Sequence, residues 1–497
     1  MNSAARATEK YTISVPTDQE IISSCQQGES AVIALFHTYT QEVTTVLATV
    51  QQRLTEVEQQ IAKNSSNSGK PPSTDGYQKK NRTSSLRGKS GKKPGGHEGA
   101  TLKQVNSPGE TVLHTVDNCE NCNASLKETP VSGIEKRQVF EIEIRFPVTE
   151  HQAEKKVCPN CGVTTTAPFP KGVTQPVQYG ALLLSLAVYF TQWQLIPLFR
   201  TQQIFVDLGG LPISETTILK AVEKMSEEIE EVLKLIVNYL IYLASTVSFD
   251  ESGLRVERSL HWLHSASTEK LTYYDIFKKR GQEAMDAMGI LQLMLGIAVH
   301  DHWKPYFSYL CLHALCNAHH LRELQFITEC YEQEWTQQMS THLLTIKDAV
   351  GAAKQAGGNA LPEEQLTIFS QKYDRIVNNG FFVNPILPSV KKRGRVKKTK
   401  PQNLLCRLQE NKTEVLRFMY DFRVSFDNNL AERDIRMVKL RQKISGCFRT
   451  LTFAKHFCRV RSYLSTVHKH NHSILDAITS VFDGNPYIPE TLLSIAN

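Results

Sequence analysis

Three acidic residues in separate parts of the chain have the chemistry of one catalytic site. Asp250 ends the apolar run VSFD, Asp301 follows the apolar run IAVH, and Glu432 comes early in the segment SFDNNLAERDIRMVKLRQKISGCFR. Carboxylates brought within a few ångströms repel one another unless cations neutralise them. A pair of Mg²⁺ or Mn²⁺ ions, about 3.5–4 Å apart on oxygen ligands, suits displacement at a phosphodiester. We therefore predict that Asp250, Asp301 and Glu432 are catalytic residues that bind Mg²⁺ or Mn²⁺.

Other acids and several histidines compete for the same assignment. The rival acids, which lie in the same predicted blocks, are Glu251, Asp275, Asp427 and Asp434. Asp250 ranks first because an acid that follows an apolar strand and precedes Gly253 has little structural reason to be there, and the same reasoning holds for Asp301. His302, His319 and His320 are either further metal ligands or, as we favour, groups that contact phosphate or satisfy polar groups of the core.

The segment around Glu432 predicts a helix with one acid above a row of bases. Asn428 or Asn429 can cap its N-terminus, where a carboxylate meets the positive end of the helix dipole. The bases that follow Glu432 on the same helical face, at spacings of four, seven and eleven residues, are Arg436, Lys439 and Lys443. An exposed helix with internal ion pairs would have a similar pattern. The acids elsewhere in the chain favour a metal site beside bound phosphates.

The segments that carry the first two acids are predicted to form a sheet. Three β-rich runs are followed by a helix, a fourth strand and a second helix, at Thr246–Val256, His261–Ser267, Leu271–Phe277, Gln282–Leu293, Gly296–His300 and Leu315–Thr328. This order matches a ribonuclease-H-like core, in which three antiparallel strands precede a parallel one. Adjacent strand ends would bring Asp250 and Asp301 to one edge, and a helix packed across that edge would deliver Glu432.

The composition is that of a soluble protein with several domains. The chain has 497 residues, 41% hydrophobic content and a net charge of +7, which favours two to four domains and a nucleic-acid partner. The positive charge is concentrated at 63–93 and 391–400. We expect a cytoplasmic protein, because no signal peptide is visible and the apolar run Ala181–Phe190 is about half the roughly 20 residues that span a bilayer. Most of the eleven cysteines are scattered, as in a reducing compartment.

Four cysteines form two pairs with zinc-ligand spacing. The pairs are Cys119 with Cys122 and Cys158 with Cys161, and two such knuckles complete a tetrahedral Zn²⁺ site. A redox pair is the alternative, although one pair would suffice for it. The alternating run Gln138–Arg145 predicts a strand between the knuckles.

Three further segments predict partners but leave alternatives open. Apolar residues between Ile33 and Ile61 follow a heptad spacing, which indicates a self-associating helix or one amphipathic helix packed on its own domain. Residues 64–99 are rich in Ser, Gly, Pro and Lys, as in a basic tether along DNA or a plain linker. Within a helical region, Leu208–Ser214 and the helix after it resemble a helix-turn-helix, although ordinary helical packing gives the same pattern.

Several blocks in a shared order resemble the transposases of the insertion sequence 66 type. The blocks are NSSNSGKPPSTDG, KPGGHEG, the two cysteine pairs, FDESGLRV, VHDHWKPYF, HALCNAHHLREL and FDNNLAERDIRMVKLRQKISGCFR. The resemblance implies a DDE-type catalytic domain with Asp250, Asp301 and Glu432 as its triad, a structural zinc site and a mostly helical insertion between Asp301 and Glu432. Lys439 matches a basic residue that related transposases use to grip DNA. Ser425 and Asn428 stand where some of those relatives have tyrosine and arginine, so the fine contacts there differ.

The sequence as a whole predicts a multidomain α+β/α protein. It would combine a ribonuclease-H-like mixed-sheet catalytic core with helical insertion, an N-terminal coiled-coil helix and a small zinc-binding domain. The predicted boundaries are an N-terminal extension at 1–32, a coiled-coil-like helix at 33–62, a basic flexible linker at 63–105, a zinc-binding domain at 106–172, a helical region at 173–244, the catalytic domain at 245–470 with its insertion at about 330–420, and a C-terminal tail at 471–497.

The resemblance implies a DNA transposase that cuts and joins the ends of its own insertion sequence. Its partners would be element-end and target DNA, a second copy of the chain, and accessory proteins encoded by the element. The predicted DNA-binding residues are Arg436, Lys439, Lys443, Arg449, Lys391, Lys392, Arg393, Arg395, Lys397 and Lys398. The alternatives are a catalytically inactive DNA-binding protein and a structure-specific nuclease without strand transfer.

Overall fold

The computed structural model describes residues 13–64, 67–68, 102–386 and 398–496. These residues form a mixed α/β structure with one mixed sheet and many helices. They divide into two compact units, of which the first comprises Met1–Lys79, Tyr179–Leu198 and Thr216–Asn497 and the second comprises Lys80–Gln178 and Phe199–Glu215. Most of the predicted linker and most of the basic loop at 391–400 lie outside the described residues.

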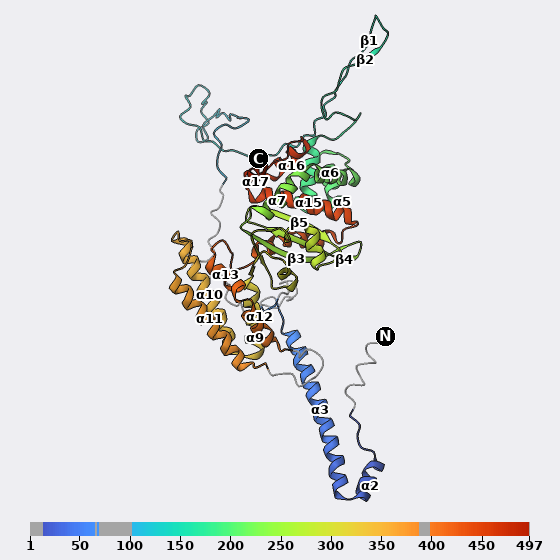
Figure 1. The fold of residues 1–497 in the computed structure, drawn as a ribbon. Helices are drawn as coiled ribbons and strands as arrows, with labels where there is room; N and C mark the ends of the chain where they lie inside the picture. The colour runs from blue at the N-terminus through green and yellow to red at the C-terminus, as the bar shows by residue number, and fades with distance from the viewer. Residues whose placement is uncertain (1–12, 65–66, 69–101, 387–397, 497) are drawn as a thin grey trace. The chain divides into compact units, whose positions relative to one another are not determined.

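The first unit contains a five-stranded sheet in the order β5-β4-β3-β6-β7 (Figure 1). Its strands are β3 (Thr246–Val256), β4 (Ser259–Ser267), β5 (Thr272–Phe277), β6 (Ile297–His300) and β7 (Leu312–Leu315). The pairs β3–β4 and β4–β5 are antiparallel, whereas β6 is parallel to both β3 and β7. The four predicted strands are confirmed with slightly shifted ends. The fifth strand, β7, was not predicted.

A two-residue turn joins β3 to β4 and sets the register of the hairpin. Val256 pairs with Ser259, and the two residues between them, Glu257 and Arg258, have φ values of 50° and 64°. Positive φ at both central positions belongs to the type I′ turn, whose twist matches that of the strands. Strand β4 therefore begins two residues earlier than the predicted His261.

The outer edge of β5 is covered by helix α15 (Leu451–Lys469). The backbone N–H of Thr272 donates to Thr466 Oγ1 at 3.1 Å, and the N–H of Tyr274 donates to Ser462 Oγ at 2.8 Å. Unpaired N–H groups at a sheet edge are a site for unwanted strand addition. Two hydroxyl groups of α15 thus accept hydrogen bonds from the edge N–H groups of β5, which would otherwise be open to pairing with a sixth strand.

Helices cover the sheet and build its core. Those of the first unit outside the sheet edge are α2 (Asp18–Gln27), α3 (Glu29–Ile61), α4 (Ala181–Val188), α6 (Glu215–Glu228), α7 (Glu230–Tyr242), α8 (Gln282–Met288), α9 (Asn317–Tyr331), α10 (Glu334–Gln355), α11 (Glu363–Val383), α12 (Lys400–Glu410), α13 (Lys412–Tyr420), α14 (Asn429–Ser445), α16 (Ile474–Phe482) and α17 (Glu490–Ala496), with a π-helical turn η3 (Tyr189–Trp193) and a 3₁₀ turn η4 (Lys304–Ser308). The helix predicted at Gln282–Leu293 is confirmed but shorter, because Gly289 adopts φ 74° and ends it.

Helices α9 to α13 form their own core on β6 and β7. Buried residues of all five helices, including Leu324, Met339, Tyr373, Leu405 and Leu416, join one apolar cluster with the two strands. Helices α10 and α11 run side by side within it (Figure 1). Helices α10 to α13 lie in the sequence between α9 and α14, where a mostly helical insertion was predicted.

The predicted heptad segment forms one long helix, α3. No residue of this helix is buried, and the heptad residues Leu47 and Leu54 are each 57% exposed. The described part of the chain leaves the apolar seam of α3 uncovered, and a self-associating helix needs such an exposed seam. Self-association stays a prediction.

The second unit contains little regular structure. A short hairpin of β1 (Lys155–Val157) and β2 (Thr164–Thr166) surrounds the second cysteine pair, and α5 (Leu198–Gly209) is its helix. The predicted strand at Gln138–Arg145 is wrong, because these residues have no regular secondary structure. Val139 and Ile142 are 83% and 84% exposed, so the alternation there has no partner to pack against. Helix α6 falls almost wholly in the first unit, and the helix-turn-helix stays a prediction.

The longest apolar run of the sequence is divided between α4 and η3, where Ala187 and Val188 are fully buried. None of the helices in the described ranges combines the length and the apolar character that a membrane span requires.

Candidate active site

Asp250 lies on β3, and Asp301 lies at the matching position one residue beyond the end of the parallel strand β6. The register of β3 against β6 pairs Ser248 with Val299. Asp250 is two residues beyond Ser248, and Asp301 is two residues beyond Val299. Side chains two residues apart on a strand point to the same face. The sequence therefore brings both acids to one face of the sheet, at the end of β6.

Helix α14 packs on that face and carries Glu432 in its first turn. The contact between α14 and β3 is apolar. It is made by alternate side chains of β3 and by side chains one turn apart on α14. The buried residues of this contact are Leu254, Val256, Ile435 and Val438. Since Leu254 and Val256 have the same parity as Asp250 along β3, the face that packs on α14 is also the face of the acid.

Asn428, the N-cap of α14, fixes this helix to the strand that carries Asp250. Its Nδ2 donates to the backbone oxygen of Phe249 at 2.7 Å, and its backbone N–H donates to Cys316 Sγ at 3.1 Å. The prediction of Asn428 or Asn429 as the N-cap is confirmed for Asn428, although its side chain makes no cap hydrogen bond. The side chain instead joins α14 to β3 immediately before Asp250.

Asp250 is the most strongly perturbed acid of the group. Burial, followed by the charges of Glu251 and Glu432 and by that of Asp301, raises its pKa to about 8. Burial also raises the pKa of Asp301, although the Trp303 N–H at 2.8 Å from Asp301 Oδ1 opposes this. A cluster of oxygen donors that repel one another is what a divalent cation stabilises. Within the described residues the ligand oxygens of Asp250, Asp301 and Glu432 do not all lie within 4.8 Å of one another. Oxygen donors that repel one another favour Mg²⁺ or Mn²⁺, and the binding of these ions by the three acids stays a prediction.

Glu251, one of the rival acids, already has partners. Its Oε1 accepts from Arg280 Nε at 3.0 Å and its Oε2 accepts from the Tyr306 hydroxyl at 2.6 Å. The guanidinium of Arg280 also lies 4.0 Å from the ring centre of Trp303. Burial raises the pKa of Glu251 despite these partners. Glu251 adds negative charge beside Asp250 and holds Arg280 at the edge of the site.

The other rival acids are engaged in the structure around the site. Asp434 lies on α14 and accepts from Ser267 Oγ, Thr272 Oγ1 and Lys469 Nζ at 2.7–3.1 Å, so it joins the helix to β4, β5 and α15. Asp275 accepts from the N–H of Ile276 at 2.7 Å. Asp427 accepts from the N–H of Asn429 at 3.1 Å.

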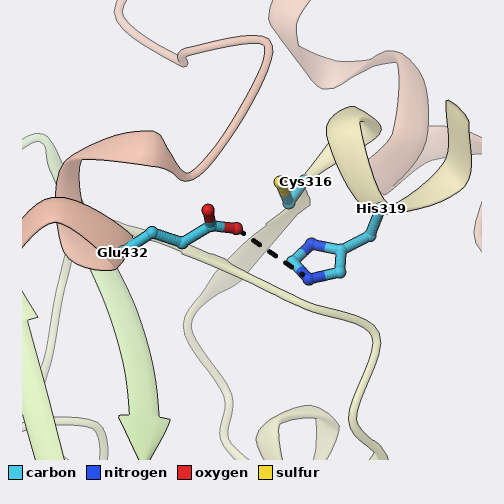
Figure 2. Close-up of side chains that lie close together, drawn as sticks. All are labelled: Cys316, His319 and Glu432. Carbon is cyan, nitrogen blue, oxygen red and sulfur yellow. Dashed lines mark ion pairs between the residues drawn. The ribbon is translucent and has the colours of Figure 1, made fainter. Parts of the chain in front are cut away.

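Glu432 lies beside His319 (Figure 2) and near the guanidinium of Arg322, which also belongs to α9. Its Oε1 is 3.6 Å from Arg322 Nη2 and 3.9 Å from His319 Nε2. Cys316 comes just before α9 and completes the group that the close-up shows. Burial lowers the pKa of His319 to about 4 and raises that of Cys316 to about 12. The imidazole and the thiol are thus both uncharged at neutral pH.

Three buried polar atoms around Glu432 have no hydrogen-bond partner within the described residues. They are His319 Nδ1, Arg322 Nε and Asn428 Oδ1. Buried polar atoms in native proteins are almost always hydrogen-bonded, and exceptions mark functional sites or unseen ligands. Cys316 and Arg322 were missed as site residues, although both stand in the quoted block HALCNAHHLREL. Asn428 was read only as a cap.

Of the other histidines, His302 and His320 stack on each other with ring centres 5.7 Å apart. His302 contacts Arg407, and Arg407 also donates to Glu323. His320 Nδ1 and Asn317 Oδ1 are 3.2 Å apart. Burial lowers the pKa of both histidines. These contacts agree with the prediction that the two rings satisfy polar groups of the core.

The predicted DNA-binding residues that the structure describes are exposed or half-buried. Arg436, Lys439 and Lys443 are exposed along α14, and Arg449 is exposed after it. Lys398 Nζ is half-buried and donates to Cys406 Sγ at 2.9 Å. The remaining predicted residues, which are Lys391, Lys392, Arg393, Arg395 and Lys397, lie outside the described residues.

Each cysteine pair forms a tight turn. The N–H of Asn123 donates to the oxygen of Cys119, and the N–H of Gly162 donates to the oxygen of Cys158, both at 2.9 Å or less. Backbone hydrogen bonds lower the pKa of Cys119 and Cys158, which favours the thiolate that binds metal. The described residues do not bring any three of Cys119, Cys122, Cys158 and Cys161 within ligand distance of one another. The shared zinc site stays a prediction.

The chain is similar to known transposases and to one family of unknown function. The model of a family described as "Transposase IS66 family" matches residues 176–456. The model of a family of unknown function, DUF6444, matches residues 25–104. No curated protein matches this chain. One similar solved structure is described as the Drosophila P element transposase strand transfer complex, at 10% identity, 61% coverage of this chain, 95% coverage of that chain and a TM-score of 0.31.

Proposed function

Because the chain belongs to the IS66 family of transposases, whose model spans residues 176–456 of its 497, we propose that it cuts DNA at the ends of its own insertion sequence and joins the freed ends to target DNA. The observation that supports this proposal is that the charges of Asp301 and Glu432 both act on the buried Asp250. Asp250 and Asp301 come from adjacent parallel strands, and the charge of Glu432 on α14 contributes to the raised pKa of Asp250.

We further propose that the sheet is a ribonuclease-H-like core with a helical insertion. Three antiparallel strands precede the parallel pair β6 and β7, and four helices intervene between α9 and α14. In this arrangement the first two acids lie on the sheet and the third comes from a helix that is distant in sequence. The insertion comes between the second and third acids in the sequence, and the helix after it, α14, packs back on the sheet.

Asp250, Asp301 and Glu432 would hold Mg²⁺ or Mn²⁺, which when bound supplies charge neutralisation at the reacting phosphate. The residues of the chain orient the reaction. Asn428 holds α14 against β3, and the exposed Arg436, Lys439 and Lys443 bind phosphates without reading bases. In the cleavage step water attacks phosphorus and the bond to the 3′ oxygen breaks. In the transfer step the 3′ hydroxyl attacks a target phosphate, loses its proton and displaces a new 3′ oxygen.

The remaining predicted domains are assigned roles that fit this function. We propose that α3 brings two copies together, since two element ends must be joined at once, and that the region from 106 to 172 binds zinc and contributes to recognition of the ends. The segment between them would follow DNA as a basic tether. DNA is the principal partner in this proposal, with a second copy of the chain.

The test is cleavage of a labelled element-end duplex with Mg²⁺ in the presence of a supercoiled target plasmid. Wild type is expected to nick the end and to transfer label to the plasmid. Asp250→Ala is expected to bind the duplex but not to nick it. The matched control is Asp374→Asn, an exposed acid on α11 whose only described ion pair is with Lys412.

Three outcomes separate the alternatives. Nicking without transfer by wild type would favour a nuclease. Binding without nicking by wild type would favour an inactive DNA-binding protein. Nicking by Asp250→Ala at the wild-type rate would exclude the acid cluster as the active site.

A further inference from the structure

Cys316, His319 and Glu432 bring a sulfur, a nitrogen and an oxygen atom to one place (Figure 2). One potential ligand atom of each residue lies within 4.8 Å of those of the other two. Within the described residues this is the one such group of three or more cysteine, histidine, aspartate or glutamate side chains. The oxygen atoms of Asp250 and Asp301 do not belong to it.

Two packed elements hold the three side chains. Cys316 is the N-cap of α9, and His319 lies in the first turn of that helix, with its N–H donating to the Cys316 oxygen at 3.1 Å. Glu432 lies in the first turn of α14. The N–H of Asn428 donates to Cys316 Sγ at 3.1 Å, which fixes the sulfur between the two helix ends.

The spacing of the ligand atoms is close to that of a metal site. Four ligands at zinc-ligand distances of about 2.0–2.3 Å around a tetrahedral ion lie about 3.3–3.8 Å apart. His319 Nε2 and Glu432 Oε1 are 3.9 Å apart, and all three ligand atoms lie within 4.8 Å. The other ring nitrogen, His319 Nδ1, is buried and has no hydrogen-bond partner within the described residues.

We propose that Cys316, His319 and Glu432 form a second metal site that binds Zn²⁺ and thereby withdraws Glu432 from the acid cluster. Sulfur and imidazole ligands favour Zn²⁺, whereas oxygen ligands alone favour Mg²⁺ or Mn²⁺. When the ion binds, the S–H bond of Cys316 breaks, a metal–sulfur bond forms and the proton goes to solvent. Three protein ligands leave one position of a tetrahedral zinc ion for water.

The binding of zinc does not depend on the proposed function, but its inhibitory effect does. Glu432 cannot complete the oxygen site with Asp250 and Asp301 while it is held by zinc beside α9. Zinc at low concentration is therefore expected to slow Mg²⁺-dependent cleavage. An active transposase damages its host genome, so an inhibitory site of this kind would limit its activity where free zinc rises.

The direct test uses Co²⁺, which takes zinc sites and gives a visible absorption band when a thiolate binds it. The protein is the full chain with all four cysteines of the predicted zinc knuckles changed to serine, namely Cys119, Cys122, Cys158 and Cys161. One equivalent of Co²⁺ is expected to give a thiolate-to-metal band. Cys316→Ser, His319→Gln and Glu432→Gln should each remove or shift the band, whereas Cys311→Ser, at a half-buried cysteine outside the group, should keep it.

The result that overturns the proposal is a band that survives Cys316→Ser unchanged, or no band with Co²⁺ in the starting protein. Serine replaces the buried thiol with a group of similar shape that can also accept from the Asn428 N–H. Circular dichroism and a thermal melt of each variant identify one that has lost its fold, and His319→Gln, at a half-buried position, gives an independent reading.

The inhibitory effect is tested separately by cleavage of the element-end duplex. With saturating Mg²⁺, added Zn²⁺ is expected to reduce the rate of wild type at least tenfold, and Cys316→Ser is expected to retain most of its own zinc-free rate. Equal inhibition of both proteins would exclude this site as the cause. If neither protein cleaves, the proposed function fails, and the Co²⁺ spectrum still decides whether the metal site exists.

Discussion

The charge of a single residue, Asp250, sets a pH dependence for the protein without metal. Burial and the nearby acids hold its pKa at about 8, well above the usual value for an unfolded chain of about 3.9. An acid whose pKa is raised by folding is protonated in the folded state, and its favourable contribution is lost as pH rises toward the folded pKa. The folded protein should therefore lose stability between about pH 4 and pH 8 from this residue.

The variant that tests this is Asp250→Asn, which mimics the protonated acid. In EDTA, the melting temperature of wild type is expected to fall by several degrees between pH 6 and pH 9. Asp250→Asn should fall less over the same interval and should be the more stable protein at pH 9. Asp374→Asn serves as the exposed control. Parallel curves for wild type and Asp250→Asn would mean that Asp250 is ionised throughout.

Asn428 is expected to act as a positioning residue. Asn428→Ala leaves the buried oxygen of Phe249 without its donor, at a cost of about 1–3 kcal/mol. It also loosens α14 against β3, so the cleavage rate should fall at least tenfold while the KM for DNA changes little. The neighbouring, exposed Asn429→Ala is the matched control. A parallel rise in KM would indicate that Asn428 contacts DNA instead.

At the scale of elements, the exposed face of α14 makes a prediction about salt. Arg436, Lys439 and Lys443 lie on one exposed side of the helix. Each cation that no longer neutralises a phosphate should reduce the slope of log K against log salt by about 0.9. The triple alanine variant is therefore expected to weaken binding to all DNA sequences alike and to reduce the slope by nearly three. Lys372→Ala, an exposed lysine on α11, should change neither quantity.

The elements also show how far sequence patterns reach. The strands β3 to β5 and the helix of Glu432 were predictable because long alternating or helical patterns indicate both an element and its buried face. The short strand β6 was predictable as an apolar run, and all four of its residues are buried. The strand β7, which is as short as β6, was missed because a histidine interrupts its apolar residues and Leu312 is 54% exposed. The strand predicted at Gln138–Arg145 is wrong although the alternation is clear. Alternation indicates a face that could be buried, but it does not provide a neighbouring strand or helix to cover that face.

The candidate site also has a part that the sequence predicted and a part that it did not. Two strand ends and one helix start could be predicted from position alone, because an acid after an apolar run has few structural reasons to be there. The companions of Glu432 could not be predicted by that argument. Cys316 and Arg322 reach it only because α9 begins beside α14, and the packing of two helices that are about 100 residues apart leaves no local pattern. The hydrogen bond from Asn428 to Phe249 is hidden for the same reason.

At the scale of the whole molecule, the division into two units predicts separable losses. The predicted zinc ligands lie in the second unit, whereas the acids lie in the first. Removal of zinc by chelation, or Cys158→Ser, is expected to weaken binding to element ends at least tenfold and to leave the main melting transition within about two degrees. Cys447→Ser, at an exposed cysteine of the first unit, is the control. Loss of the main transition would place zinc in the central fold.

The bond between Asn428 and Phe249 also has a consequence for biosynthesis. It joins residues 179 positions apart in the chain. At a synthesis rate of about 5–20 residues per second, the ribosome needs roughly 10–40 s to make the chain between them. Once Asp301 has been made, and until α14 follows, the nascent protein contains the strands that precede Asp250 and Asp301 but not the helix that carries Glu432. Under the proposed function, a nascent chain that has not yet reached α14 is therefore unable to cut DNA, and a premature stop before α14 should yield a protein that binds DNA through its earlier domains without cutting it.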